Sequence, residues 1–132
     1  MRFKYTILYV ENVGQTLSFY QQVFGFPIKR HHESGDYGEL DTGTTTLSFA
    51  SIDLMSGLGK SAVSANPEAP SFEIAIEMDK KDMAGVIANA IEAGAKLVQE
   101  IREESWGQTT AYVCDPNGVL IEICSPVKGN HS

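Results

Sequence analysis

The stretch that decides the fold is Ala111–Ile123, AYVCDPNGVLIEI. Asp115-Pro116-Asn117-Gly118 combines four residues that favour tight turns, and β-prone residues lie on both sides of it. The segment therefore predicts a β-hairpin with strands Gln108–Cys114 and Val119–Ser125. Cys114 and Cys124 would then lie on the order of 15 Å apart, which is too far for a disulfide. We expect both thiols to be free and buried.

Upstream of the hairpin, a strand, a helix and another strand are predicted. Phe72–Met78 alternates apolar and polar residues, which is typical of a strand. Asp79–Ala93 has apolar residues at helical spacing and is followed by Gly94, a common helix terminator. Lys96–Arg102 favours a further strand. The second half of the chain therefore has the order βαβββ.

The first half repeats this order. Asn12 is a suitable N-cap for a helix over Val13–Val23, and Gly25 ends it. The predicted strands are Phe3–Val10, Phe26–His32, Tyr37–Asp41 and Thr45–Ser51. We therefore predict an α+β fold made of two βαβββ modules in one domain, residues 1–132. The modules cover 1–52 and 71–126, joined by a linker at 53–70 that holds a short ordered turn, with a tail at 127–132.

Two of these segments resemble a known superfamily. Tyr20–Phe26 resembles the helix end, and Ala111–Ile123 the hairpin, of the vicinal oxygen chelate proteins, which include glyoxalase I, bleomycin resistance proteins and extradiol dioxygenases. The resemblance covers the chain up to Pro126. It implies curved mixed sheets around an open cavity (the glyoxalase/bleomycin resistance-like fold), and often a homodimer.

The resemblance also implies where a metal would bind. Metal-dependent members use up to four ligands, commonly His or Glu, on the first and last strands of each module. The equivalent positions here are Tyr5, Ser48, Glu73 and Glu122; Ser48 and Glu122 each follow an aspartate by seven residues. Only Glu122 is of the usual ligand type, and a transition metal needs several His, Cys or carboxylate donors. We therefore expect no family-type metal and no other cofactor.

A ligand-binding face is the alternative use of these positions. The predicted alternation places a mostly apolar set of side chains with two carboxylates on one face: Tyr5, Ile7, Tyr37, Ser48, Glu73, Ala75, Ala111 and Glu122. Trp106 would lie near the rim. Aromatic rings beside carboxylates favour an organic cation. Two close carboxylates, Glu73 and Glu122, could also share a proton and act as a general acid and base.

Composition limits the partners. The chain has 132 residues and a formal net charge of -7, with a pI near 4.8. An acidic chain argues against general nucleic-acid binding, and no apolar run is long enough to span a membrane. The N-terminal residues do not resemble a secretory signal, so we expect a cytoplasmic protein.

Three functions stay open at this point. The first is binding of a small aromatic or cationic molecule without metal or turnover. The second is a metal-dependent lyase or isomerase resembling lactoylglutathione lyase. The third is a metal-free enzyme whose catalytic pair is Glu73 and Glu122.

Overall fold

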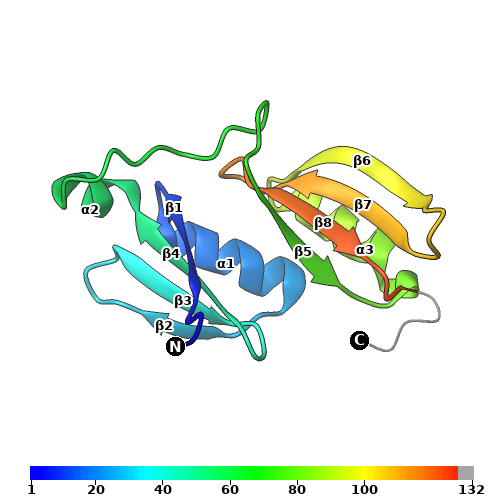
Figure 1. Ribbon diagram of the computed structural model, residues 1–132, viewed down its shortest axis with the longest axis horizontal. Helices are drawn as coiled ribbons and strands as arrows, with labels where there is room; N and C mark the ends of the chain where they lie inside the picture. The colour runs from blue at the N-terminus through cyan, green and yellow to red at the C-terminus, as the bar shows by residue number, and fades with distance from the viewer. Residues whose placement is uncertain (128–132) are drawn as a thin grey trace. The chain divides into compact units, whose positions relative to one another are not determined.

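The computed structural model describes residues 1–127 and divides into two compact units (Figure 1). The first unit is Met1–Ala65 and the second begins at Asn66. Each unit holds one four-stranded mixed sheet and one long helix, in the order βαβββ. The predicted α+β fold and its internal duplication are therefore confirmed.

The first unit has its strand order set by one parallel and two antiparallel pairings. Its elements are β1 (Thr6–Val10), α1 (Val13–Phe24), β2 (Ile28–His31), β3 (Tyr37–Asp41) and β4 (Thr46–Ser51). The sheet order is β1-β4-β3-β2, and β1 runs parallel to β4. Strand β1 begins three residues later than the predicted Phe3, so Tyr5 lies just before the strand.

Helix α1 begins and ends where its capping residues predict. The Asn12 side chain accepts a hydrogen bond from the Gln15 N–H at 2.9 Å, which satisfies one of the free donors of the first turn. Gly25 follows the helix with φ 74°, a left-handed conformation that glycine adopts without strain. The helix packs on one face of the sheet through buried residues that include Leu17 and Tyr20.

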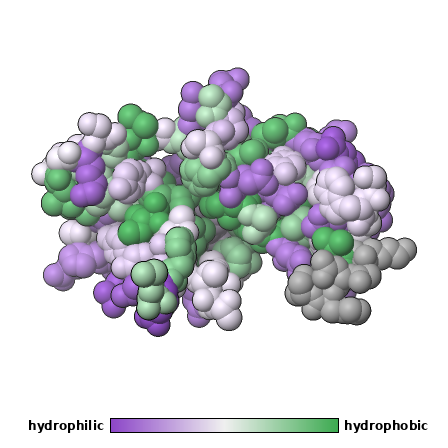
Figure 2. Space-filling view, viewed as in Figure 1, coloured by the Kyte–Doolittle hydropathy of each residue, from purple (hydrophilic) through white to green (hydrophobic). Residues whose placement is uncertain are grey.

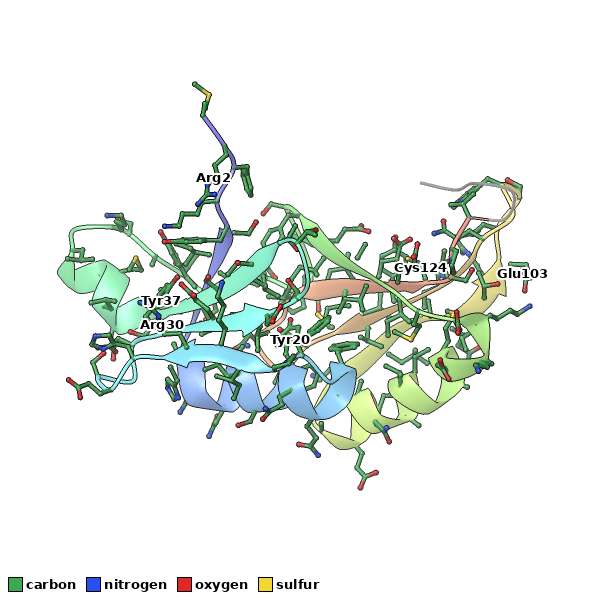
Figure 3. All side chains as sticks on the ribbon, turned by 90° about the horizontal axis from the view of Figure 1, so that it is seen from below. Arg2, Tyr20, Arg30, Tyr37, Glu103 and Cys124 are labelled. Atoms are coloured by element: carbon green, nitrogen blue, oxygen red, sulfur yellow. The ribbon has the colours of Figure 1, made fainter. Side chains whose placement is uncertain are left out.

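The core of the first unit lies between α1 and β3–β4. The rings of Tyr20 and Phe49 are 5.3 Å apart, and both side chains are fully buried. Gly38 lets helix and sheet approach closely: a Cβ at this position would lie 2.6 Å from Leu17 Cδ1. Figure 3 shows Tyr20 on the helix side of this sheet.

The second unit repeats the arrangement. Its elements are β5 (Glu73–Glu77), α3 (Lys80–Glu92), β6 (Lys96–Glu103), β7 (Thr109–Cys114) and β8 (Leu120–Cys124). The sheet order is β5-β8-β7-β6, with β5 parallel to β8. Met83, Ile87 and Ala90 form the buried stripe of α3.

A short helix occupies the start of the predicted linker 53–70. Helix α2 (Ile52–Gly57) follows β4 directly. Ser51 Oγ accepts a hydrogen bond from Leu54 N at 3.0 Å and donates one to Asp36 Oδ1 at 2.8 Å. Between α2 and β5 the chain has no strand or helix. The predicted tail lies outside the described residues except for Val127.

The hairpin around Asp115–Gly118 forms as predicted. Asp115 is buried, and its Oδ1 accepts hydrogen bonds from Asn117 N at 2.8 Å and Val119 N at 2.9 Å. Cys114 and Cys124 are both free and buried, as expected. Within residues 1–127, no helix has the length and apolar character needed to cross a membrane.

Candidate functional site

In each unit, one face of the sheet is opposite the helix, and we call it the open face. Backbone register places Ile7, Ser48 and Glu39 in one row across the first sheet. The equivalent row of the second sheet holds Ala75, Glu122 and Tyr112. Ser48 and Glu122 are thus equivalent positions, as the sequence comparison of the two modules predicted.

On the open face of the first unit, a tyrosine hydroxyl joins two side chains. Tyr37 donates to Glu39 Oε2 at 2.8 Å and lies 3.1 Å from the buried Ser48 Oγ. Burial, together with the nearby Glu39 carboxylate, raises the pKa of Tyr37 from 10.0 to about 12, although the Ser48 hydrogen bond acts in the opposite direction. Tyr37 therefore stays protonated at neutral pH.

On the open face of the second unit, a tyrosine hydroxyl lies between two carboxylates. The Tyr112 hydroxyl is 3.1 Å from Glu73 Oε2 and 3.2 Å from Glu122 Oε2. Burial first, and then the charges of these two carboxylates, raise the pKa of Tyr112 far above its ordinary value. We call these three residues the acidic cluster.

The acidic cluster has fewer hydrogen-bond donors than acceptors, because one hydroxyl lies between two carboxylates. Tyr112 carries one hydroxyl proton, so it donates to only one carboxylate at a time. Within the described residues, Glu73 and Glu122 have no other hydrogen-bond or ion-pair partner. In the first unit the serine at the equivalent position carries its own proton. The second unit is therefore the one that leaves acceptor capacity open to a ligand.

One predicted face assignment is wrong. Ala111 was expected on the open face, but it is paired with Ile123 and is completely buried on the helix side. Because side chains alternate along a strand, a shift of one residue moves a side chain to the other face. Tyr112 takes the place expected for Ala111. In the hairpin Cys114 pairs with Leu120, so Tyr112 pairs with Glu122. This pairing of strand positions on the two sides of the turn is the signal that identifies Tyr112.

Trp106 and Tyr5 are the remaining predicted residues. Trp106 is in the hairpin between β6 and β7, 56% exposed, and its Nε1 donates to Gln108 Oε1 at 2.7 Å. Tyr5 is half-buried and lines a cavity of the first unit together with Glu39, the partner of Tyr37. The structure thus brings together Tyr37 with Ser48, and Glu73 with Glu122. Sequence reasoning missed Glu39 and Tyr112, which complete the two clusters.

The available donors do not fit a transition-metal site. Within residues 1–127, no three His, Cys, Asp or Glu side chains are grouped so that they could hold a metal ion. The acidic cluster offers two carboxylates and a phenol that stays protonated. The His31 ring lies against Gly14, and His32 Nδ1 lies 2.9 Å from Ser34 Oγ, so neither histidine adds to it.

The chain matches a known family of protein domains. The sequence profile of the glyoxalase-like domain matches residues 3–128. The chain belongs to the glyoxalase-like domain family. The resemblance seen in the two motifs is thereby confirmed, and the fold is that of the vicinal oxygen chelate superfamily.

Solved structures similar to this glyoxalase-like chain carry varied descriptions. A glyoxalase/bleomycin resistance protein/dioxygenase family enzyme from Burkholderia phytofirmans PsJN is 25% identical, with a TM-score of 0.80 over 92% of this chain and 96% of the other. A glyoxalase-related enzyme from Fulvimarina pelagi is 18% identical, with a TM-score of 0.80 over 100% and 96% of the two chains. A fosfomycin resistance protein from Mesorhizobium loti is 11% identical, with a TM-score of 0.70 over 96% and 93%.

These comparisons establish the fold of the glyoxalase-like chain and its family. A comparison with curated protein sequences finds no significant match. Because one fold of this kind serves both enzymes and resistance proteins, the activity has to be argued from the side chains of the site.

Proposed function

We propose that this glyoxalase-like protein binds a small organic cation at the acidic cluster, without a metal. The observation that carries the proposal is the single hydroxyl proton of Tyr112 between Glu73 and Glu122. A ligand ammonium or guanidinium group would supply the missing N–H donors and neutralise the carboxylates in one step.

The surroundings of the cluster support a cation rather than an anion. Glu77 shares the open face of β5 with Glu73, because residues two apart on a strand point the same way. The Tyr112 ring offers a π-face to a cation. At an effective dielectric constant of about 20, a cation 4 Å from one carboxylate gains about 4 kcal/mol, and exposure of Glu73 to solvent reduces this.

The test compares two probes of the same shape and opposite charge. Benzylammonium and benzoate are titrated by calorimetry against the wild-type protein and against Glu122→Gln and Glu73→Gln. We expect benzylammonium to bind more tightly than benzoate, and either substitution to weaken it by about tenfold. Glu92→Gln, which removes one charge from the last turn of α3, is the matched control and should leave the affinity unchanged. Equal weakening by Glu92→Gln would contradict the proposal.

The same carboxylate pair supports a second candidate, metal-free acid–base catalysis. Glu73 and Glu122 both reach one phenol oxygen, so a proton can pass between them through Tyr112. Glu122→Gln separates the two functions. A binding protein loses ligand affinity in this variant, whereas an enzyme keeps affinity for its substrate and loses turnover.

A cytoplasmic location stays a prediction, and so does the formation of a homodimer. Strand β6 ends the second sheet and exposes Leu97, Val98 and Ile101, whose exposed fractions are 43%, 58% and 41%. Figure 2 shows apolar residues, coloured green, at the surface of the molecule. A second copy covering them would bury apolar surface. Light scattering should then give twice the chain mass of 14.4 kDa, and a monomer would contradict the prediction.

A further inference from the structure

We propose a second ligand site in the first unit, a cavity that takes the anionic group of a small aromatic molecule, a carboxylate or a phosphate. The cavity has a volume of about 510 Å³, within the range of small-molecule sites. All of its lining residues belong to the first unit. None of its lining residues belongs to the acidic cluster, whose members all lie in the second unit.

Three segments form the cavity. Arg2–Tyr5 precedes β1, Lys29 and Arg30 belong to β2, and Thr44 and Thr46 come from the hairpin between β3 and β4. Glu39 of β3 completes the lining. Figure 3 shows Arg2 and Arg30 on this unit, with Arg2 on the side away from helix α1. The cavity therefore collects residues that are separated by up to about forty positions in the sequence.

The charge of the lining is opposite to that of the chain. Arg2, Lys4, Lys29 and Arg30 line the cavity, so four of the ten basic residues of a chain with net charge -7 face one space. Its single carboxylate, Glu39, accepts a hydrogen bond from Tyr37 at 2.8 Å. The local excess of positive charge favours an anion.

These basic side chains are available to a ligand. The ion pairs recorded within residues 1–127 are Lys80–Glu103 and Arg102–Glu104, so no carboxylate of the described chain forms an ion pair with the basic groups of the cavity. Arginine binds a carboxylate or phosphate through two parallel N–H donors. Thr44 and Thr46 also line the cavity, and their hydroxyls are further hydrogen-bond donors for an anion.

Two aromatic residues indicate that the ligand also has an apolar part. Phe3 lines the cavity with 86% of its surface exposed, and Tyr5 lies beside it with Lys4 Nζ 5.3 Å from its ring centroid. A ligand ring packed on Phe3 would remove apolar surface from water. An aromatic anion therefore satisfies both the charge and the apolar part of the lining.

The experiment uses three probes with one phenyl ring: phenyl phosphate, benzoate and benzylammonium. Each is titrated by calorimetry against the wild-type protein and against the double variant Lys29→Gln/Arg30→Gln. The control is Lys60→Gln/Lys81→Gln, which removes the same charge from residues that do not line the cavity. We expect at least one of the two anions to bind, with affinity about tenfold lower in the Lys29/Arg30 variant and unchanged in the control.

The salt dependence of anion binding and the effect of Glu122→Gln on it are two independent tests of the site. Because the basic groups are exposed, affinity for the anion should fall when NaCl is raised from about 0.1 M to about 1 M. Glu122→Gln should leave anion binding unchanged, so failure of either proposed site can be recognised without the other. Tighter binding of phenyl phosphate identifies a phosphate ester as the ligand class, and tighter binding of benzoate identifies a carboxylate. The proposal is overturned if neither anion binds at about 10 mM, or if the two double variants weaken binding equally.

Discussion

At the scale of single residues, the equivalent positions Ser48 and Glu122 differ in the proton that they offer to a neighbouring tyrosine. Ser48 and Glu122 face Tyr37 and Tyr112 respectively, at 3.1 Å and 3.2 Å. The serine can donate a proton to its tyrosine, and the carboxylate cannot. A duplicated sheet therefore gives one cluster in which the serine adds a donor and one in which two carboxylates share a single hydroxyl donor.

This contrast predicts that Glu122→Gln stabilises the protein while it impairs cation binding. The amide N–H₂ supplies a donor to Tyr112 or Glu73, which replaces an unfavourable contact between two acceptors. We expect the free energy of unfolding in urea to rise by about 0.5–1 kcal/mol. Glu33→Gln, at an exposed position in the turn between β2 and β3, is the control, with no change expected. A loss of stability in Glu122→Gln alone would show that the cluster is already satisfied in the free protein.

Tyr37 gives a prediction in alkaline solution. Its pKa is 10.0 in the unfolded chain and about 12 in the folded protein. Because the folded state holds the proton more tightly, this stabilisation is complete below pH 10 and is lost as the pH rises toward 12. In Tyr37→Phe, the free energy of unfolding should fall less between about pH 9 and about pH 11 than in the wild type. Parallel pH dependences for the two proteins would contradict the assignment.

At the scale of elements, the sequence predicts best where a local interaction ends a helix or closes a turn. Asn12, Gly25 and Asp115 mark their boundaries through short-range hydrogen bonds or backbone conformation, so the pattern alone finds them. Placing Ala111 required the pairing of two strands, and an error of one residue exchanged it for Tyr112. The cavity could not be predicted at all, because it depends on where three separate segments meet.

Close packing of helix α1 on its sheet predicts different outcomes for two glycines. At Gly38, a Cβ would lie 2.6 Å from Leu17 Cδ1 and 3.1 Å from Val13 Cγ1, both on buried side chains of α1. Gly38→Ala should therefore lower the free energy of unfolding by about 1–3 kcal/mol. Gly85 lies inside α3 with nothing within 4 Å of an added Cβ. Gly85→Ala should raise stability by about 0.5–1 kcal/mol. Equal effects in the urea-unfolding curves would rule out the clash.

At the scale of the whole molecule, net charge is a poor guide to the ligand of any one site. The formal charge of -7 argued only against general nucleic-acid binding. The acidic cluster has the same sign of charge as the whole chain, whereas the cavity of the first unit has four basic side chains and one carboxylate. Electrostatic interactions between exposed charges are screened beyond about 10 Å at an ionic strength near 0.1 M. The ligand of each site is therefore selected by the charges close to it rather than by the net charge of the chain.

The division into two units predicts where a protease cuts first inside the chain. Between α2 and β5 the backbone has few hydrogen bonds, such as Lys60 N to Met55 O at 3.0 Å, and Lys60 is exposed. The other basic residues between β1 and the end of β8 lie in strands or at the start of α3. Proteases need an extended, accessible segment, so trypsin should make its first internal cut after Lys60, which mass spectrometry of early time points can detect. Lys60→Gln should slow the appearance of the two halves. Early cleavage within β6, after Lys96 or Arg102, would instead place the weakest region in the second sheet.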